Sequence, residues 1–152
     1  MTPRTIRAEV VLEKAAWVRS MLAELERLPL ASLDQFLSDR RNPAAAESFL
    51  RRALEGLLDL GRHILSKGFG EGVVEYKKVA ERLAEHGVVK ADTGRRLVEM
   101  AGYRNRLVHF YDEPTHQELF QICTGRRADV EAVVDEILGW LRQHPERLDT
   151  SL

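Results

Sequence analysis

Apolar side chains recur along most of this chain at intervals of three and four residues, the spacing of one face of an α-helix. The first such segment covers about residues 6–27, and Pro29 ends it. We interpret residues 31–42 as mostly a connection, with a short helical turn around Phe36. The chain therefore opens with one long amphipathic helix followed by a linker.

The clearest helical pattern begins at Asn42, which is a favourable N-cap, and Pro43 suits the first helical position. A wide apolar stripe follows, made of Phe49, Leu50, Ala53, Leu54, Leu57, Leu58, Gly61, Ile64 and Leu65. Gly68, just after the last periodic residue, is typical of a helix end. Because Gly61 lies on the apolar stripe, we expect another helix to cross closely at that position.

Four more helical segments are expected further along the chain. They are residues 76–85, a helix capped by Asp92 or Thr93 that stops before Pro114, residues 115–123, and residues 129–143 after a turn at Gly125. The run at residues 72–76 is too short and isolated to predict a strand. From about His144 onward we expect a loose tail.

These segments predict an all-α fold with a single domain over residues 1–152. Long amphipathic helices joined by short turns pack as an antiparallel bundle. The first, second, fourth and last long segments are the expected four main members. The glycine-rich residues 67–72 lack the preceding strand and the Gly-Lys-Ser/Thr ending of a phosphate loop, so we interpret them as a turn.

Composition and charge narrow the function classes. The chain has 23 basic and 24 acidic side chains, so any nucleic-acid site must come from a local cluster of arginines. Its one cysteine, Cys123, excludes an intrachain disulfide framework. There is no apolar run long enough to span a membrane, and the first residues lack the apolar core of a signal peptide. We therefore expect a cytoplasmic protein.

The richest polar chemistry lies in the stretch GYRNRLVHFYDEP, residues 102–114. Asn105 and His109 are four residues apart and would share one helix face. Arg104 would lie roughly 140° from His109 around the helix, and its long side chain could swing toward them. Leu107 and Val108 are expected to face the core. In the last helical turn, the helix dipole would help His109 to hold a proton.

These residue types suit the cleavage of a phosphodiester. A histidine that titrates near neutral pH serves as a general acid or base, and an arginine offers a forked donor set for phosphate. Internal attack by an RNA 2′-hydroxyl needs a base, an acid and positive charge, but no metal. Because the motif holds a single histidine, a two-fold dimer could supply the second one across a shared cleft.

Two other interpretations remain open from the residues alone. A histidine near a helix end commonly binds backbone carbonyls, and an Arg-Asn pair there is commonly a surface feature. The chain would then be a helical interaction module that docks a partner without catalysis. Alternatively, Arg104 and His109 would hold the phosphate of a nucleotide without turnover.

The string RNRLVHFY, from Arg104 to Tyr111, matches the RNxLVHxY form of the Arg-x4–6-His signature of the HEPN superfamily. The chain resembles the HepT-like toxins of that superfamily in particular. Residues 46–65 resemble the long helix of the family, and residues 76–84 resemble the segment before its catalytic helix. The resemblance covers roughly residues 9–142.

This resemblance implies a small helical bundle that dimerises and acts as a metal-independent endoribonuclease without a cofactor. It implies a toxin–antitoxin operon in which the partner is an MNT-type nucleotidyltransferase antitoxin. Arg104 and His109 correspond to the catalytic pair, and Asn105 to the polar residue beside them. Tyr111 corresponds to the tyrosine that the partner modifies with AMP, which would block the cleft and silence the toxin.

Several other arginines are candidates for contact with an RNA substrate. Arg106 is the strongest, because it lies inside the motif. The remaining groups are Arg95 with Arg96, Arg126 with Arg127, and Arg40, Arg41, Arg51 and Arg52. Binding through such contacts should weaken steeply as salt is added.

Overall fold

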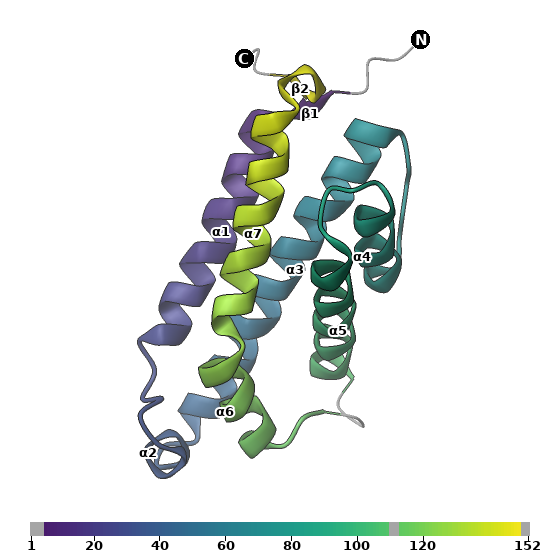
Figure 1. Ribbon diagram of the computed structural model, residues 1–152. Helices are drawn as coiled ribbons and strands as arrows, with labels where there is room; N and C mark the ends of the chain where they lie inside the picture. Colours follow the sequence, from purple (N-terminus) through teal and green to yellow (C-terminus); the bar gives the residue numbers. More distant parts are fainter. Residues whose placement is uncertain (1–4, 110–112, 150–152) are drawn as a thin grey trace.

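The computed structural model describes residues 5–109 and 113–149, and this part of the chain is mainly helical (Figure 1). Its elements are β1 (Ile6–Arg7), α1 (Ala8–Glu26), α2 (Leu33–Leu37), α3 (Arg41–Phe69), α4 (Tyr76–Glu85), α5 (Ala91–Val108), α6 (His116–Gly125), α7 (Arg127–Gln143), η2 (Pro145–Arg147) and β2 (Leu148–Asp149). The predicted all-α fold is confirmed. Within the described residues, no helix combines the length and apolar character needed to cross a membrane.

The four expected main helices, α1, α3, α5 and α7, form the body of the bundle (Figure 1). α1 and α3 run antiparallel and pack along their length, and α7 lies beside α1. α4 and α5 form a second antiparallel pair that packs on the other side of α3. α3 therefore contacts every other long helix, and its apolar stripe supplies much of the buried core.

Gly61 lies where α4 crosses α3, as the sequence predicted. A Cβ atom at this position would lie 2.6 Å from Cδ1 of Leu83 and 3.0 Å from Cγ1 of Val79. Both contacts are shorter than packed carbon atoms normally allow, so only glycine lets α4 approach this closely. The close crossing brings Tyr76, the first residue of α4, over the polar edge of α3.

The two ends of α3 differ from the sequence-based prediction. The helix begins at Arg41, and the Asn42 side chain donates 3.1 Å to the carbonyl of Phe36 instead of capping the helix. At the other end Gly70, with φ of 69°, is the left-handed residue that ends the helix. Gly68 is in the last turn, where its missing side chain makes room for Ile6.

The N-terminus of α5 is capped from another helix rather than by Asp92 or Thr93. The carboxylate of Glu136, in α7, accepts a 2.6 Å hydrogen bond from the Lys90 amide and a 2.7 Å bond from the Thr93 hydroxyl. A carboxylate beside the first turn also compensates the positive end of the helix dipole. This contact fixes the start of α5 against α7.

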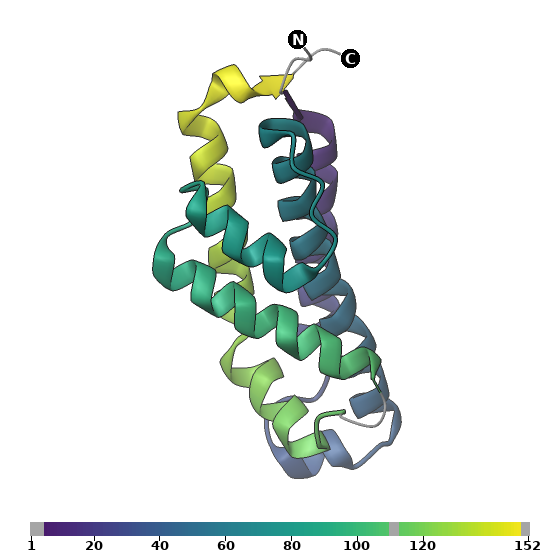
Figure 2. The same ribbon diagram turned by 90° about the vertical axis from the view of Figure 1, so that its right-hand side faces the viewer.

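The expected loose tail is wrong for its described part. Residues 145–147 form the η2 turn, and Leu148–Asp149 pairs in parallel with Ile6–Arg7. Arg147 donates 2.7 Å to the carbonyl of Gly68, which ties the tail to the end of α3. Both ends of the described chain therefore meet at one end of the bundle (Figure 2). Strands of two residues are too short to leave an alternating pattern in the sequence.

Candidate functional site

The polar motif lies at the C-terminal end of α5. The helix ends at Val108, so His109 follows it in an extended conformation rather than standing in the last turn. The His109 side chain is exposed. Leu107 is buried as expected, whereas Val108 is 40% exposed and does not face the core. Tyr111, the expected site of AMP transfer, lies outside the described residues.

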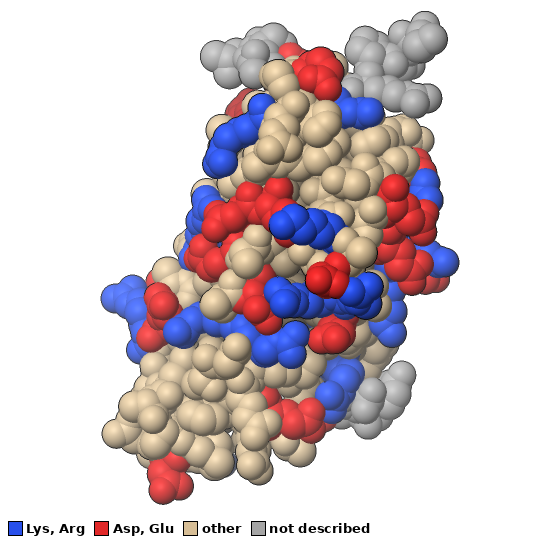
Figure 3. Space-filling model, in the orientation of Figure 1, with Lys and Arg blue, Asp and Glu red and all other residues tan. Residues whose placement is uncertain are grey.

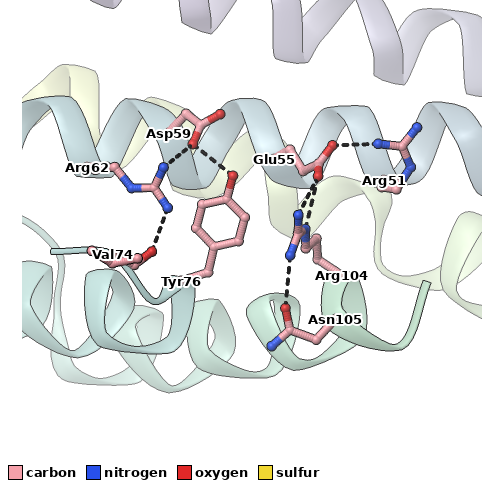
Figure 4. A network of polar contacts seen from close by, with 8 residues as sticks. All are labelled: Arg51, Glu55, Asp59, Arg62, Val74, Tyr76, Arg104 and Asn105. Atoms are coloured by element: carbon pink, nitrogen blue, oxygen red, sulfur yellow. Dashed lines mark hydrogen bonds and ion pairs between the residues drawn. The ribbon is translucent and has the colours of Figure 1, made fainter. Parts of the chain in front are cut away.

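Arg104 is held by two fixed partners on either side of its guanidinium group (Figure 4). Its Nε and Nη2 atoms donate to Oε2 of Glu55, in α3, over 3.0 and 2.7 Å. Its Nη1 atom donates 3.2 Å to Oδ1 of the neighbouring Asn105. Charge-assisted, two-point contacts of this kind fix the plane of a guanidinium group as well as its position.

Glu55 is shared between two arginines. Its second carboxylate oxygen accepts a 2.7 Å hydrogen bond from Nη1 of Arg51, one turn earlier on α3. The side chains of Glu55 and Arg104 are 22% and 24% exposed, so solvent only partly screens their interaction. With two guanidinium groups and one carboxylate, the cluster keeps one positive charge.

Tyr76 connects this cluster to a second one along α3. Its hydroxyl donates 2.8 Å to Oδ1 of Asp59, and the guanidinium carbons of Arg62 and Arg104 each lie 4.7 Å from its ring centroid. Arg62 also donates 2.6 Å to the carbonyl of Val74 (Figure 4). Burial, reinforced by the hydrogen bond to Asp59, raises the pKa of Tyr76 to about 12. Tyr76 is therefore neutral at physiological pH.

Arg104 and Asn105 border a hollow in the protein surface. Its other lining residues are Arg62, Val74, Glu75, Tyr76 and Lys77. Arg62 comes from α3, Val74 and Glu75 from the end of the α3–α4 connection, and Tyr76 and Lys77 from the first turn of α4. A ligand that reaches Arg104 would enter this hollow.

Arg106, which was predicted from the sequence as a supporting residue and an RNA contact, is directed toward α6. Its Nη1 atom donates 3.0 Å to Oε2 of Glu118, and this bond holds the pKa of Glu118 below its ordinary value. Residues two apart on a helix point to nearly opposite sides. The structure thus brings Arg104 and Asn105 together but does not bring Arg106 to them.

The other arginine groups named from the sequence are mostly engaged in ion pairs. The pairs are Arg95 with Asp92, Arg126 with Glu99 and Asp129, Arg127 with Glu26, Arg41 with Asp39, and Arg51 with Glu55. On the face shown in Figure 3, basic and acidic side chains are intermixed over the middle of the molecule.

Sequence reasoning missed Glu55, Asp59 and Tyr76. The two carboxylates are four residues apart at the polar edge of the apolar stripe, which places them on one face of α3. That spacing was a visible signal, but it does not reveal which helix lies opposite. The close α3–α4 crossing at Gly61 and the α3–α5 contact determine that Tyr76 and Arg104 lie opposite these carboxylates.

Comparison of the sequence with known proteins identifies a matching family and a related protein. A family model described as "HepT-like: Ribonuclease HepT-like" matches residues 18–137. The tRNA nuclease HepT of Aphanizomenon flos-aquae (strain 2012/KM1/D3) is 28% identical over 121 residues, which are 79% of this chain and 82% of that protein.

Solved structures share the fold at lower identity. The tri-AMPylated HEPN toxin of Shewanella oneidensis, in complex with MNT antitoxin, has a TM-score of 0.78 and 20% identity, covering 86% of this chain and 98% of that one. YutE of Bacillus subtilis, a cytosolic protein of unknown function, has a TM-score of 0.73 and 18% identity, covering 91% and 93%. These similarities show that the bundle has the HEPN-like arrangement.

Proposed function

Because the chain belongs to the HepT-like family, whose model spans residues 18–137, we propose that it is a toxin that cleaves RNA without a metal ion. Arg104 and His109 are the proposed catalytic residues. The observation that carries the proposal is that the guanidinium group of Arg104 is fixed in place but has N–H donors to spare. An arginine has five N–H donors, and the hydrogen bonds to Glu55 and Asn105 engage three. The other two remain for a phosphate in the hollow that Arg104 borders.

The proposed reaction is internal attack at phosphorus. A base takes the proton of the RNA 2′-hydroxyl, the 2′-oxygen attacks the adjacent phosphorus, and the 5′-oxygen leaves with a proton from an acid. The products end in a 2′,3′-cyclic phosphate and a 5′-hydroxyl. Arg104 stabilises the negative charge that develops on the phosphoryl oxygens.

The reaction needs a base and an acid, and the motif of one chain supplies one histidine. A homodimer with two-fold symmetry would place two copies of Arg104 and His109 across one cleft. The exposed position of His109 beyond the end of α5 is compatible with such a shared cleft. Glu55 and Asn105 would act as positioning residues, since they contact Arg104 rather than the substrate. Arg106 would support the site indirectly, by fastening the end of α5 to α6.

The proposed partner is an MNT-type nucleotidyltransferase antitoxin that silences the toxin by AMP transfer to Tyr111. The support is the Shewanella oneidensis toxin, which is tri-AMPylated and in complex with MNT antitoxin. In the transfer the tyrosine oxygen attacks the α-phosphorus of ATP, pyrophosphate leaves and the phenolic proton is released. Intact mass after co-expression with the partner should show AMP increments that vanish in Tyr111→Phe. An unchanged mass of the unsubstituted protein would contradict this part of the proposal.

The catalytic assignment is tested by substitution of each residue in antitoxin-free protein. Arg104→Ala and His109→Ala should abolish RNA cleavage while the helical circular dichroism stays close to that of the parent. His116→Ala is the matched control, because this exposed histidine stands outside the motif at the start of α6. Cleavage that survives His109→Ala would remove His109 from the mechanism.

A further inference from the structure

Beside Arg104 the surface hollow carries a cation that the catalytic proposal does not use. We propose that this hollow is a second phosphate-binding subsite for the RNA strand, with Lys77 as its principal contact. The inference rests on the proposed ribonuclease function and deepens it. It places the nucleotide next to the cleaved bond over the first turn of α4.

The Lys77 side chain lies across α5 at Gly102. A Cβ atom at Gly102 would lie 3.5 Å from Cε of Lys77 and 3.8 Å from its Nζ. The lysine stem therefore runs over Gly102, two residues before Arg104, and its ammonium group borders the hollow.

Lys77 also differs from its neighbour in its charge environment. Lys78 forms an ion pair with Glu81 over 3.5 Å. Among the residues that the structure describes, no carboxylate lies within ion-pair distance of Lys77, although Glu75 stands at the edge of the hollow. An exposed ammonium group without a fixed partner can accept a phosphate without first breaking an ion pair.

The other cations of the hollow are already compensated. Arg104 is paired with Glu55, and Arg62 is paired with Asp59 over 3.3 Å. These pairs fix the two guanidinium groups and offset part of their charge, because Glu55 is shared between Arg104 and Arg51. Lys77 adds a positive charge that no ion pair among the described residues offsets. Its attraction for a second phosphate adds to that of Arg104 for the first.

The same geometry indicates what the subsite recognises. Tyr76 is the aromatic residue of the hollow, and both guanidinium groups lie over its ring. The ring is therefore occupied and offers no free face on which a base could stack. Contacts to phosphate carry no sequence information. We therefore infer that the subsite holds the RNA backbone irrespective of sequence.

The test compares two adjacent lysines in a protein that cannot cleave its ligand. In the His109→Ala background, Lys77→Gln and Lys78→Gln each remove one positive charge from the first turn or two of α4. Binding of a labelled single-stranded RNA is measured at several salt concentrations for both variants and the His109→Ala parent. Each phosphate contact on a single strand contributes about 0.7 to the slope of log K against log salt. Lys77→Gln should make this negative slope shallower by about 0.7, for RNAs of different sequence alike. Lys78→Gln should leave the slope unchanged.

The outcomes separate this inference from the function on which it rests. If the parent binds RNA and Lys77→Gln leaves the slope unchanged, or if Lys78→Gln lowers it equally, the subsite is overturned while the ribonuclease proposal stands. If the parent does not bind RNA and the unsubstituted protein does not cleave it, both the ribonuclease proposal and the subsite that rests on it are wrong. Circular dichroism of both variants checks that the exposed substitutions leave the fold intact.

Discussion

Glu55 of α3 and Arg104 of α5 are joined by two hydrogen bonds that converge on one carboxylate oxygen. This contact fastens the polar motif to the central helix of the bundle. It fixes the direction of Arg104, and it also offsets the charge that would attract a phosphate. The fixed direction of Arg104 favours turnover, whereas the offset charge weakens the binding of RNA. Measuring kcat and KM therefore separates the two effects.

Glu55→Gln should lower kcat and strengthen RNA binding. The amide keeps the shape of the side chain but loses the charge-assisted bonds, so Arg104 is held less firmly, and a misplaced catalytic group costs about tenfold to a hundredfold in rate. The lost negative charge raises the attraction for RNA, so KM should fall. Steady-state kinetics on one RNA gives both constants. The matched control is Glu81→Gln, which removes an exposed carboxylate paired with Lys78 and should change neither constant.

A parallel fall of kcat and rise of KM in Glu55→Gln would contradict this account. That result would indicate a general loss of structure rather than a change in the orientation of Arg104. The melting temperature of the variant distinguishes the two cases.

Tyr76→Phe should reveal the burial of the Tyr76 phenol and its hydrogen bond to Asp59 through the pH dependence of stability. The pKa of Tyr76 is raised in the folded protein from 10.0 to about 12, so folding favours the neutral phenol. The stabilisation is fully present below pH 10 and is lost as the pH rises toward 12. The difference in unfolding free energy between the parent and Tyr76→Phe should therefore be about 1–2 kcal/mol near neutral pH and should shrink above pH 10. Urea unfolding at several pH values measures it, and a constant difference would refute the assignment.

Gly61→Ala should destabilise the protein by about 1–3 kcal/mol, because the new methyl group overlaps Leu83 and Val79 in the α3–α4 crossing. Gly139→Ala is the matched control in another helix. A Cβ atom there meets nothing within 4 Å, so alanine should stabilise α7 by about 0.5–1 kcal/mol. Urea unfolding gives both values. Equal effects of the two substitutions would show that helix propensity, not crowding, governs position 61.

Arg106→Gln should weaken the contact between α5 and α6 in a pH-dependent manner. The pKa of Glu118 is held below its ordinary 4.5 by Arg106, so this stabilisation is present above that pH and is lost as the pH falls through the folded value. The melting temperature of Arg106→Gln should lie below that of the parent at pH 7 and approach it at acidic pH. Arg95→Gln, which breaks an exposed pair with Asp92, is the control. An offset that does not change with pH would contradict the assigned role of Glu118.

Local sequence patterns predicted most of the helices of this fold, because three- and four-residue spacing is a local property. Gly61 could be assigned to a close crossing since it interrupts a stripe of larger residues. The cap of α5 by Glu136 could not be predicted, because its partners are more than 40 residues away in the chain. The same holds for the pairing of Ile6–Arg7 with Leu148–Asp149.

The contacts of the candidate site are also either local, and predictable from the sequence, or between residues far apart in the chain, and not predictable from it. Arg104 and Asn105 are neighbours in sequence, and their contact is local. Glu55 lies 49 residues before Arg104, and its role depends on how α3 and α5 face each other. Arg106 was predicted as a supporting residue and an RNA contact because it lies inside the motif, but the helix turns it toward α6 instead.

Metal-independent cleavage of RNA by this protein can be measured by incubating antitoxin-free protein with RNA in the presence of EDTA and analysing the product ends. We predict cleavage by the unsubstituted protein, with 2′,3′-cyclic phosphate and 5′-hydroxyl ends, and none by His109→Ala prepared in parallel. Intact RNA after incubation with the unsubstituted protein, or equal cleavage by the two preparations, would contradict the claim.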